Sequence, residues 1–455
     1  MVYCDGVART EPQAPNFLLR WSLQAIVAGG MGAVLVRGFV VFTGTLERAV
    51  GASGVHPVVV AVGAAALVGL LIYRLAPGAA GEGVPAYLRA VRGPESDLPL
   101  RDTIMKYPAA ILTLGCYGSG GAVGPIGRVT AGLSQWATRH LQRLLPRLFA
   151  DSSQHHANYH APTTAAISGM AAAVASIFGA PIAGAVFAVE VIQTDQLRYH
   201  QLFPAALAAG TAVFVSSLAG WPPPVNPDLP VFRAEVFLVL PVIVVGFFCG
   251  VMGIAYTSLY RVIARSMGRE RSSRRIPAMI AGMGVSALLG AALSPTLWGT
   301  ARGFYDAVLH GDFPRLSLSI APTISSPAAI LAILIVAKIV GNCITTGSGM
   351  SAGFTGPAAL VGLAGGALVA VVLGIAPATP GYVVLLVAGF AGMLAATMNT
   401  PLAGAILAVE LFGGGYGVAG ILSAMIAFQV ARFNTIYEVA LETADAAPGT
   451  ASDGV

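Results

Sequence analysis

Charged side chains are scarce in this sequence. Asp, Glu, Lys and Arg make up 10% of its 455 residues, whereas hydrophobic residues make up 56%. About 25% of the residues in an average soluble domain are charged, so this composition excludes an ordinary soluble protein. Apolar runs long enough to cross the hydrocarbon core, which takes about 20 residues, occur at 23–41, 58–75, 236–256, 276–293, 328–344 and 382–398. We therefore expect a multi-pass membrane protein.

The sequence also lacks paired cysteines. Its four cysteines form no CxxC motif and predict neither a disulfide framework nor a zinc site; they are Cys4, Cys116, Cys249 and Cys343. His155, His156 and His160 have a spacing that suits metal ligands, but they follow an arginine-rich stretch and are interpreted as part of a polar loop. We expect neither a metal nor a cofactor.

Catalytic signatures are weak. Residues 349–353 fit the G-x-S-x-G hydrolase motif, which requires a strand before the turn and a histidine downstream. The surrounding pattern is helical, and no histidine follows His310. A GxSG stretch at 51–54 places its serine too near His56 for an intramembrane protease. We predict no catalytic residues and no enzyme, and a membrane enzyme built on Ser351 or the three clustered histidines is the alternative of a different class.

The formal net charge of +5 is concentrated in two stretches, with three arginines between 139 and 147 and six between 261 and 275. Arginine-rich loops of membrane proteins lie on the cytoplasmic side, so we expect both stretches there and no nucleic-acid partner. Asp5, Arg9 and Glu11 precede the first apolar run, which argues against a cleavable signal peptide. The Ala, Gly, Val and Arg usage and the absence of a long soluble domain favour a bacterial inner membrane.

The chain carries an internal repeat. Residues 181–190 read PIAGAVFAVE and residues 401–410 read PLAGAILAVE, with seven of ten positions identical. A second pair, GSGGAVGPIG at 118–127 and GSGMSAGFTG at 347–356, precedes the first in each half. Repeated halves with segments interrupted by Gly and Pro indicate a membrane transport protein whose binding site lies between the halves. The predicted divisions are a cytoplasmic segment (1–15), two membrane halves (16–220 and 221–437) and a short, disordered tail (438–455).

Three glycine-bracketed segments predict an anion site. Each opens a stretch that is helical in pattern, and the first turn of a helix leaves backbone N–H groups without internal partners. Each helix N-terminus carries about half a positive charge, so several ends directed at one point bind an anion. The alternative is that small residues only permit helix packing. The residues are Gly81, Glu82, Gly83, Val84 and Pro85; Gly124, Pro125, Ile126, Gly127 and Arg128; and Gly353, Phe354, Thr355, Gly356 and Pro357.

From about residue 23 to 437 the sequence resembles the CLC family of chloride channels and proton/chloride exchangers. The family motifs GSGIP, GREGP and GxFxP correspond to GEGVP at 81–85, GPIGR at 124–128 and GFTGP at 353–357. The run APIAGAVFAVEV at 180–191 is similar to the family's APLAGxxFxxEE, and Tyr437 to its late tyrosine. The resemblance implies an all-α membrane protein with an inverted repeat of many tilted and broken transmembrane helices. It also implies a homodimer with one anion pathway in each subunit and without cytosolic regulatory domains.

Two departures from the family motifs concern proton coupling. The gating glutamate of GREGP corresponds to Ile126, and the second glutamate of the EE pair, which transfers protons on the inner side of exchangers, corresponds to Val191. Neither side chain can be protonated. Since the familiar proton route is missing, the resemblance implies passive conduction of chloride or a related small anion.

Glu82 is a third departure, because it replaces the serine of GSGIP, whose hydroxyl helps to coordinate the anion. The helix dipole favours a carboxylate at a helix N-terminus, although an isolated acid at mid-membrane costs about 2.5 to 3.5 kcal/mol. Glu82 is therefore expected to occupy the anion site as a tethered anion, to pair with Arg128, or to carry protons from a new position. The alternative is that it points into water or towards a neighbouring helix.

Glu190 and Glu410 occupy matching positions of the repeat within apolar sequence. Acids inside a membrane are functional candidates by default, but the duplication favours a shared structural role, such as hydrogen bonding to backbone at a helix end. Tyr437 follows the last apolar run, where its hydroxyl would contact an anion from the cytoplasmic side.

The sequence thus predicts a passive chloride channel of CLC type. Its expected ligands are the backbone amides of 124–127 and 354–356 and the hydroxyls of Tyr437 and Thr355, while Glu82 modifies occupancy together with Arg128. Its expected partners are a small anion, a second copy of the chain and membrane lipid. Two alternatives share the fold: a proton-coupled exchanger that uses Glu82 as a relocated gate, and a variant selective for fluoride or nitrate.

Overall fold

The computed structural model of the protein describes residues 15–93, 97–146, 161–192, 199–225, 236–268 and 275–445. Most of these residues are helical, and ten helices among them are long and apolar enough to cross a membrane. The predicted all-α membrane fold is confirmed. His155, His156 and His160, the arginines between 269 and 274, and both chain ends (1–14 and 446–455) lie outside the described residues.

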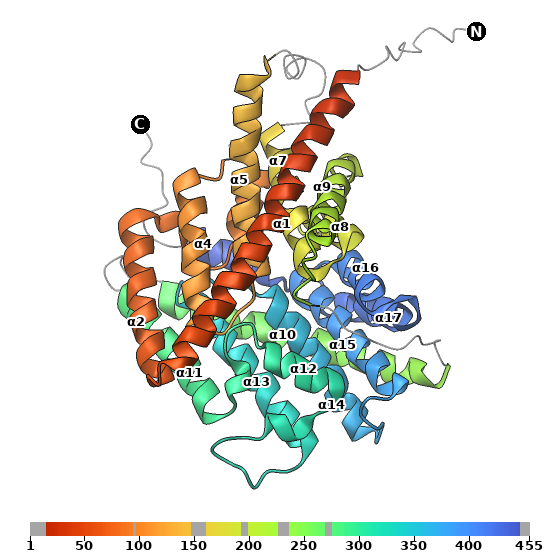
Figure 1. Ribbon diagram of the computed structural model, residues 1–455. Coiled ribbons are helices and arrows are strands. Elements are labelled where there is room, and N and C mark those ends of the chain that lie inside the picture. Colours follow the sequence, from red (N-terminus) through yellow and green to blue (C-terminus); the bar gives the residue numbers. More distant parts are fainter. Residues whose placement is uncertain are drawn as a thin grey trace, which may run out of the picture.

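The helices follow one another along the chain as two similar series (Figure 1). Before residue 220 they are α1 (Pro15–Ala52), α2 (Pro57–Leu70), α3 (Val84–Arg92), α4 (Leu100–Gly115), α5 (Val123–Leu144), α7 (Ala161–Phe178), α8 (Pro181–Glu190) and α9 (Tyr199–Leu218). After it they are α10 (Val239–Gly268), α11 (Arg275–Ala292), α12 (Arg302–His310), α13 (Pro327–Gly347), α14 (Thr355–Val372), α15 (Pro380–Met398), α16 (Pro401–Phe412), α17 (Gly414–Ala431) and α18 (Ile436–Asp445).

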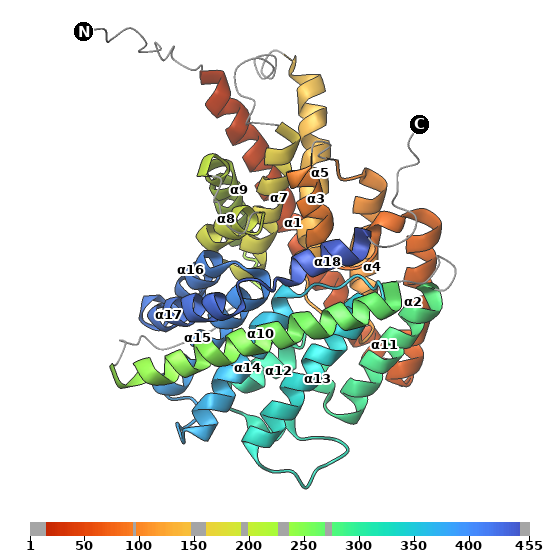
Figure 2. The same cartoon turned by 180° about the vertical axis from the view of Figure 1, so that it is seen from behind.

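The helices differ widely in length and tilt. With 38 residues, α1 is about 57 Å long at 1.5 Å per residue, which exceeds the ~30 Å hydrocarbon core. It and α10 run obliquely through the molecule (Figures 1 and 2). By contrast, α8 and α16 have 10 and 12 residues and are too short to cross the core. The predicted pattern of tilted and broken helices is therefore confirmed.

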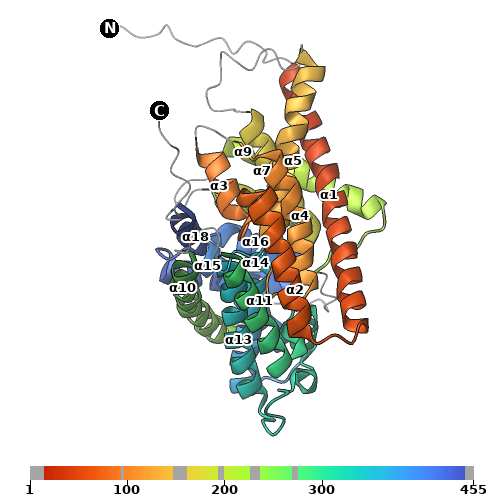
Figure 3. The same cartoon turned by 90° about the vertical axis from the view of Figure 1, so that its left-hand side faces the viewer.

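The most deeply buried spanning helices are α7 and α15, which the other helices surround. Each packs against the helix that follows a repeated glycine segment, α7 against α5 and α15 against α14. In the side view, α1 and α5 lie on one side of the molecule and α10 and α13 on the other (Figure 3).

Two acids, the buried Glu190 and the half-buried Glu410, join the short helices α8 and α16 reciprocally. The Glu190 carboxylate, at the end of α8, accepts hydrogen bonds from the N–H groups of Leu402 (2.9 Å) and Ala403 (2.7 Å) at the start of α16. The Glu410 carboxylate of α16 accepts the corresponding bonds from Ile182 (3.0 Å) and Ala183 (2.7 Å). The predicted structural role, hydrogen bonding to backbone at a helix end, is confirmed at both positions.

The segment after Tyr437 differs from the prediction of a disordered tail. α18 continues to Asp445, so residues 438–445 are helical. Arg92 of α3 pairs with Glu438 (2.7 Å), and Arg265 of α10 lies 3.8 Å from Glu442. The acidic composition that indicated disorder thus provides ion pairs with two other helices.

We predict that Glu190→Ala lowers the stability of the protein more than an exposed acid does. The substitution leaves two N–H groups at the start of α16 without acceptors, and each buried donor left unsatisfied costs about 1–3 kcal/mol. Thermal unfolding in detergent measures the effect, and Asp312→Ala, an exposed position, is the control. Equal midpoints for the two variants would contradict the structural role of Glu190.

Candidate functional site

The two repeated glycine segments meet in the interior. The N–H of Gly121 donates to the carbonyl of Gly353 (2.9 Å), and the N–H of Gly353 donates to the carbonyl of Gly121 (2.8 Å). This antiparallel bridge places the first turns of α5 and α14 side by side. Backbone N–H groups in the first turn of a helix have no partner within it, so the bridge brings two electropositive ends together.

A polar cluster fixes this bridge from α13 and α10. The amide nitrogen of Asn342 donates to the carbonyls of Ser119 and Gly353, both at 3.2 Å. Tyr256 donates its hydroxyl to the Asn342 amide oxygen. The Asn342 and Tyr256 side chains are both fully buried. The sequence analysis did not identify this cluster, although a lone asparagine within an apolar helix is a signal for it.

The third glycine segment brings the start of α3 against α5. A Cβ atom on Gly83 would lie 2.2 Å from the carbonyl oxygen of Gly124, and a Cβ on Gly124 would lie 1.7 Å from Oε1 of Glu82. Only glycine fits at position 83, because a Cβ there would overlap backbone, whereas a Cβ at position 124 would force the Glu82 carboxylate to move. The helices α3, α5 and α14 therefore begin around one point, as the three glycine segments predicted.

Glu82 occupies that point. Its Oε2 accepts hydrogen bonds from the N–H groups of Gly83 (2.6 Å) and Val84 at the start of α3. Its carboxylate also faces the backbone amide of Phe354, next to the start of α14. The side chain is 5% exposed, which rules out the alternative in which Glu82 points into water. A carboxyl group thus lies where three helix dipoles favour a negative charge.

Two buried cations hold the loop before Glu82. The Lys106 ammonium donates to the carbonyls of Ala79 (3.0 Å) and Gly81. The Arg128 guanidinium donates to the carbonyl of Gly78. Arg128 binds this loop and forms no ion pair with Glu82 among the described residues, so the alternative in which those two side chains pair is wrong. The charged neighbours of Arg128 include Asp102 and Arg89.

Lys106 has a counterpart in the second half that the sequence analysis also missed. Lys338 of α13 donates to the carbonyls of Leu297 (3.0 Å) and Gly299 (3.1 Å), in the loop before α12. Both lysines are fully buried. The available signal was a single lysine at a similar position in the apolar sequence of each half, and its function is to bind loop carbonyls.

Tyr437 closes the site on the side of α18. Its hydroxyl lies 3.1 Å from the Thr355 hydroxyl, and its ring packs against Phe354. Tyr437 is 1% exposed and its hydroxyl is close enough to the Glu82 carboxylate for the two to interact electrostatically. The structure therefore brings the predicted hydroxyl ligands to the same point as the helix ends.

Ile126 separates the site from a cavity on the side opposite Tyr437. The cavity has a volume of about 180 Å³ and is lined mainly by apolar residues of α1, α5, α7, α14 and α15, with Glu47 and Arg302 among its polar residues. Ile126 is fully buried and forms part of the cavity wall. An apolar side chain thus occupies the first turn of α5, where the resemblance implies a gating glutamate.

The other predicted site residues surround this point as backbone. Gly81 donates its N–H to the carbonyl of Gly349 (2.8 Å) and has the positive φ (69°) that glycine tolerates best. The remaining members of the three segments lie in the first turns of their helices: Pro85 in α3, Pro125 and Gly127 in α5, and Gly356 and Pro357 in α14.

The residues of the enzyme and metal alternatives have these surroundings. Ser351 follows the helix α13 and not a strand, and the Ser53 hydroxyl donates to the carbonyl of Val50 (2.7 Å). Nδ1 of His56 accepts a hydrogen bond from the N–H of Val58 (3.3 Å) and so caps α2. Among the described residues, no group of three His, Cys, Asp or Glu side chains is arranged to hold a metal ion.

Comparison with known sequences gives one family. A family model described as "voltage gated chloride channel" matches residues 64–432. An uncharacterized protein of Methanocaldococcus jannaschii is 26% identical over 60% of this chain and 64% of its own length. A chloride/fluoride channel protein of Pseudomonas syringae pv. tomato is 24% identical over 60% and 56%. An H(+)/Cl(-) exchange transporter of Vibrio vulnificus is 24% identical over 81% and 75%. The alignments thus span less than two thirds of the first two relatives.

Solved structures agree in fold. A CLC-type fluoride/proton antiporter matches with a TM-score of 0.77 at 20% identity, covering 94% of this chain and 99% of that structure. A slow cyanobacterial Cl−/H+ antiporter matches with a TM-score of 0.74 at 18% identity, covering 95% and 98%. At these identities the likeness shows the fold alone.

The contact between Gly124 and the Glu82 carboxylate generates a stability prediction. We expect Gly124→Ala to lower the unfolding midpoint in detergent, because the added Cβ overlaps the carboxylate. In a Glu82→Ala background the same substitution should cost much less, since residues in contact couple by about 0.5–3 kcal/mol. Gly63→Ala, where a Cβ meets nothing within 4 Å, is the control. If the effects of Gly124→Ala and Glu82→Ala on the unfolding midpoint are additive, the contact between Gly124 and the Glu82 carboxylate is contradicted.

Proposed function

Because the chain belongs to the voltage gated chloride channel family, we propose that it provides a passive pathway for chloride or a related small anion. One observation carries the proposal: the buried Glu82 carboxylate lies at the meeting point of α3, α5 and α14. A group of preorganised N–H donors that accommodates a carboxylate also suits a dehydrated halide. Glu82 acts in this proposal as a tethered competitor of the transported anion.

The passive mode rests on the residues on either side of Glu82. Ile126 on one side and Val191 on the other carry no exchangeable proton, so protons have no carboxylate relay through these two positions. Lys106 interacts electrostatically with Glu82, which offsets part of the carboxylate charge and makes the site available to a second anion. Conduction then requires the Glu82 carboxylate to leave the three helix ends, by rotation of its side chain or by protonation.

A second candidate is proton-coupled exchange with Glu82 as the relocated gate. It is favoured because Glu82 is itself an ionisable group in the anion site, with Oε1 lacking a hydrogen-bond partner among the described residues. The relatives include an H(+)/Cl(-) exchange transporter and a chloride/fluoride channel protein, so both modes of transport and both anions are found among them. The transported anion in our proposal is accordingly a small halide.

The proposed surroundings are a bacterial inner membrane, in which lipid covers the apolar exterior and a second copy of the chain completes a homodimer. Exposed apolar side chains lie on the neighbouring helices α8, α9, α16 and α17, and they suit the second copy. They include Ile182, Phe214, Leu402, Val418 and Ile421. Each subunit holds its own anion site, because all three helix ends come from one chain.

We predict that Glu82→Gln raises chloride efflux from proteoliposomes at neutral pH about tenfold, which corresponds to about 1.4 kcal/mol. The neutral amide loses its charge attraction to the three helix ends, so the anion meets a weaker competitor. Wild-type efflux should rise on acidification, because protonation has the same effect as the substitution, whereas Glu82→Gln should respond little. Asp312→Asn is the control. Unchanged rates and pH response in Glu82→Gln would remove Glu82 from the mechanism.

The passive and coupled modes are separated by an imposed proton gradient. We predict that the gradient drives no uphill chloride or fluoride uptake into vesicles that contain the wild-type protein, while downhill flux exceeds that of empty vesicles. Uphill uptake at a fixed stoichiometry that is lost in Glu82→Gln would establish the second candidate instead.

A further inference from the structure

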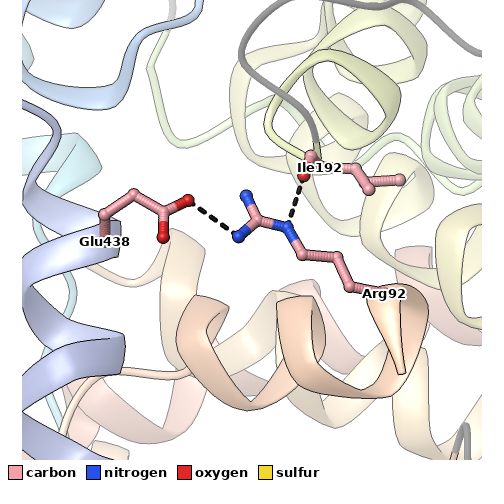
Figure 4. Close-up of polar contacts among 3 residues, drawn as sticks. All are labelled: Arg92, Ile192 and Glu438. Carbon is pink, nitrogen blue, oxygen red and sulfur yellow. Dashed lines mark hydrogen bonds and ion pairs between the residues drawn. The ribbon is translucent and has the colours of Figure 1, made fainter. Parts of the chain in front are cut away.

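Arg92 lies at the cytoplasmic end proposed for the pathway and connects three helices (Figure 4). It is the last residue of α3. Its Nε donates to the carbonyl of Ile192, just beyond α8 (2.5 Å), and its Nη1 lies 2.7 Å from Oε1 of Glu438 on α18. The guanidinium therefore bridges the end of α8 and the first turn of α18, the helix that carries Tyr437.

These two charged side chains line a small cavity next to Tyr437. The cavity has a volume of about 10 Å³ and is also lined by Val191, Asn399 and Thr435. Such a volume holds about one water molecule. A chloride ion is larger than a water molecule and does not fit. The Arg92 and Glu438 side chains are 30% and 41% exposed, so the cavity lies between the buried site and solvent. An anion that enters here must first move a side chain.

The charges in the cavity indicate which side chain moves. Arg92 is the one cation among the residues that line it. Its two acidic neighbours there differ: Glu190 is held by the N–H groups of Leu402 and Ala403, whereas Glu438 has Arg92 as its ion-pair partner. A guanidinium forms charge-assisted hydrogen bonds with carboxylates and other anions alike. Glu438 therefore occupies the position on Arg92 that an entering anion would take.

We propose that Arg92 is an anion-binding residue at the inner mouth, and that Glu438 is a tethered carboxylate which a small anion displaces there. The inference rests on the proposed function and adds a second competitor to Glu82, at a separate point of the same route. Tyr437 precedes Glu438 in the chain, so release of Glu438 from Arg92 removes one contact that holds the start of α18, beside the Tyr437 hydroxyl contact with Thr355.

The test compares chloride efflux at increasing chloride concentration on the cytoplasmic face, in inside-out patches or in proteoliposomes. Glu438→Gln should lower the chloride concentration for half-maximal efflux by about twofold to fivefold, the span expected from pairing of partly exposed charges. Arg92→Gln should raise it, and Glu438→Gln should have no further effect in the Arg92→Gln background. Arg92→Lys should retain most of the wild-type behaviour.

Glu442→Gln is the matched control, because Glu442 is also an acid of α18 near an arginine (Arg265, 3.8 Å) but does not line the cavity. If Glu438→Gln and Glu442→Gln shift the half-maximal concentration equally, or neither shifts it, the inference fails while anion transport by the wild type still stands. If both Arg92→Gln and Glu438→Gln change only the unfolding midpoint, the ion pair is structural and the inference again fails. Absence of efflux from the wild type would instead overturn the proposed function.

Discussion

Convergence of three helix N-termini on one buried carboxylate is the constraint on which this structure depends. The starts of α3 and α5 can approach so closely because Gly83 has no Cβ, which would overlap the carbonyl oxygen of Gly124. The electropositive ends would repel one another without a negative charge between them, and Glu82 supplies it. Lys106 and Arg128 bind the carbonyls of the preceding loop, which fixes the position of Glu82. In the proposed function, a transported anion replaces the Glu82 carboxylate at these helix ends.

Local sequence patterns predicted the helix ends but not their contacts. The glycine segments located the starts of α3, α5 and α14, because the chemistry of a helix N-terminus is confined to a few neighbouring residues. The sequence GEGVP at 81–85 did not decide the orientation of Glu82. It is compatible with a side chain that points into the anion site, into water or towards Arg128. The structure decides it through Gly124, some 40 residues away in the chain, whose missing side chain leaves room for the carboxylate.

The sequence analysis also did not predict hydrogen bonds between residues far apart in the chain. Lys338 binds carbonyls 39 and 41 residues earlier, and Asn342 binds Ser119 in the other half of the repeat. Hydrophobic periodicity contains no information on such pairs, because the partners are backbone atoms that every residue possesses. The helical residues after Tyr437 were missed for the same reason: Glu438 is ordered by Arg92, which lies in the first half of the chain.

The reciprocal bonds between α8 and α16 have a consequence for how the protein is made. A ribosome delivers α8 more than 200 residues before α16, so the N–H groups of Ile182 and Ala183 enter the lipid before their acceptor, Glu410, exists. The Glu190 carboxylate is likewise made before its donors, the N–H groups of Leu402 and Ala403. Each half is thus incomplete during synthesis and supplies the missing acceptor of the other.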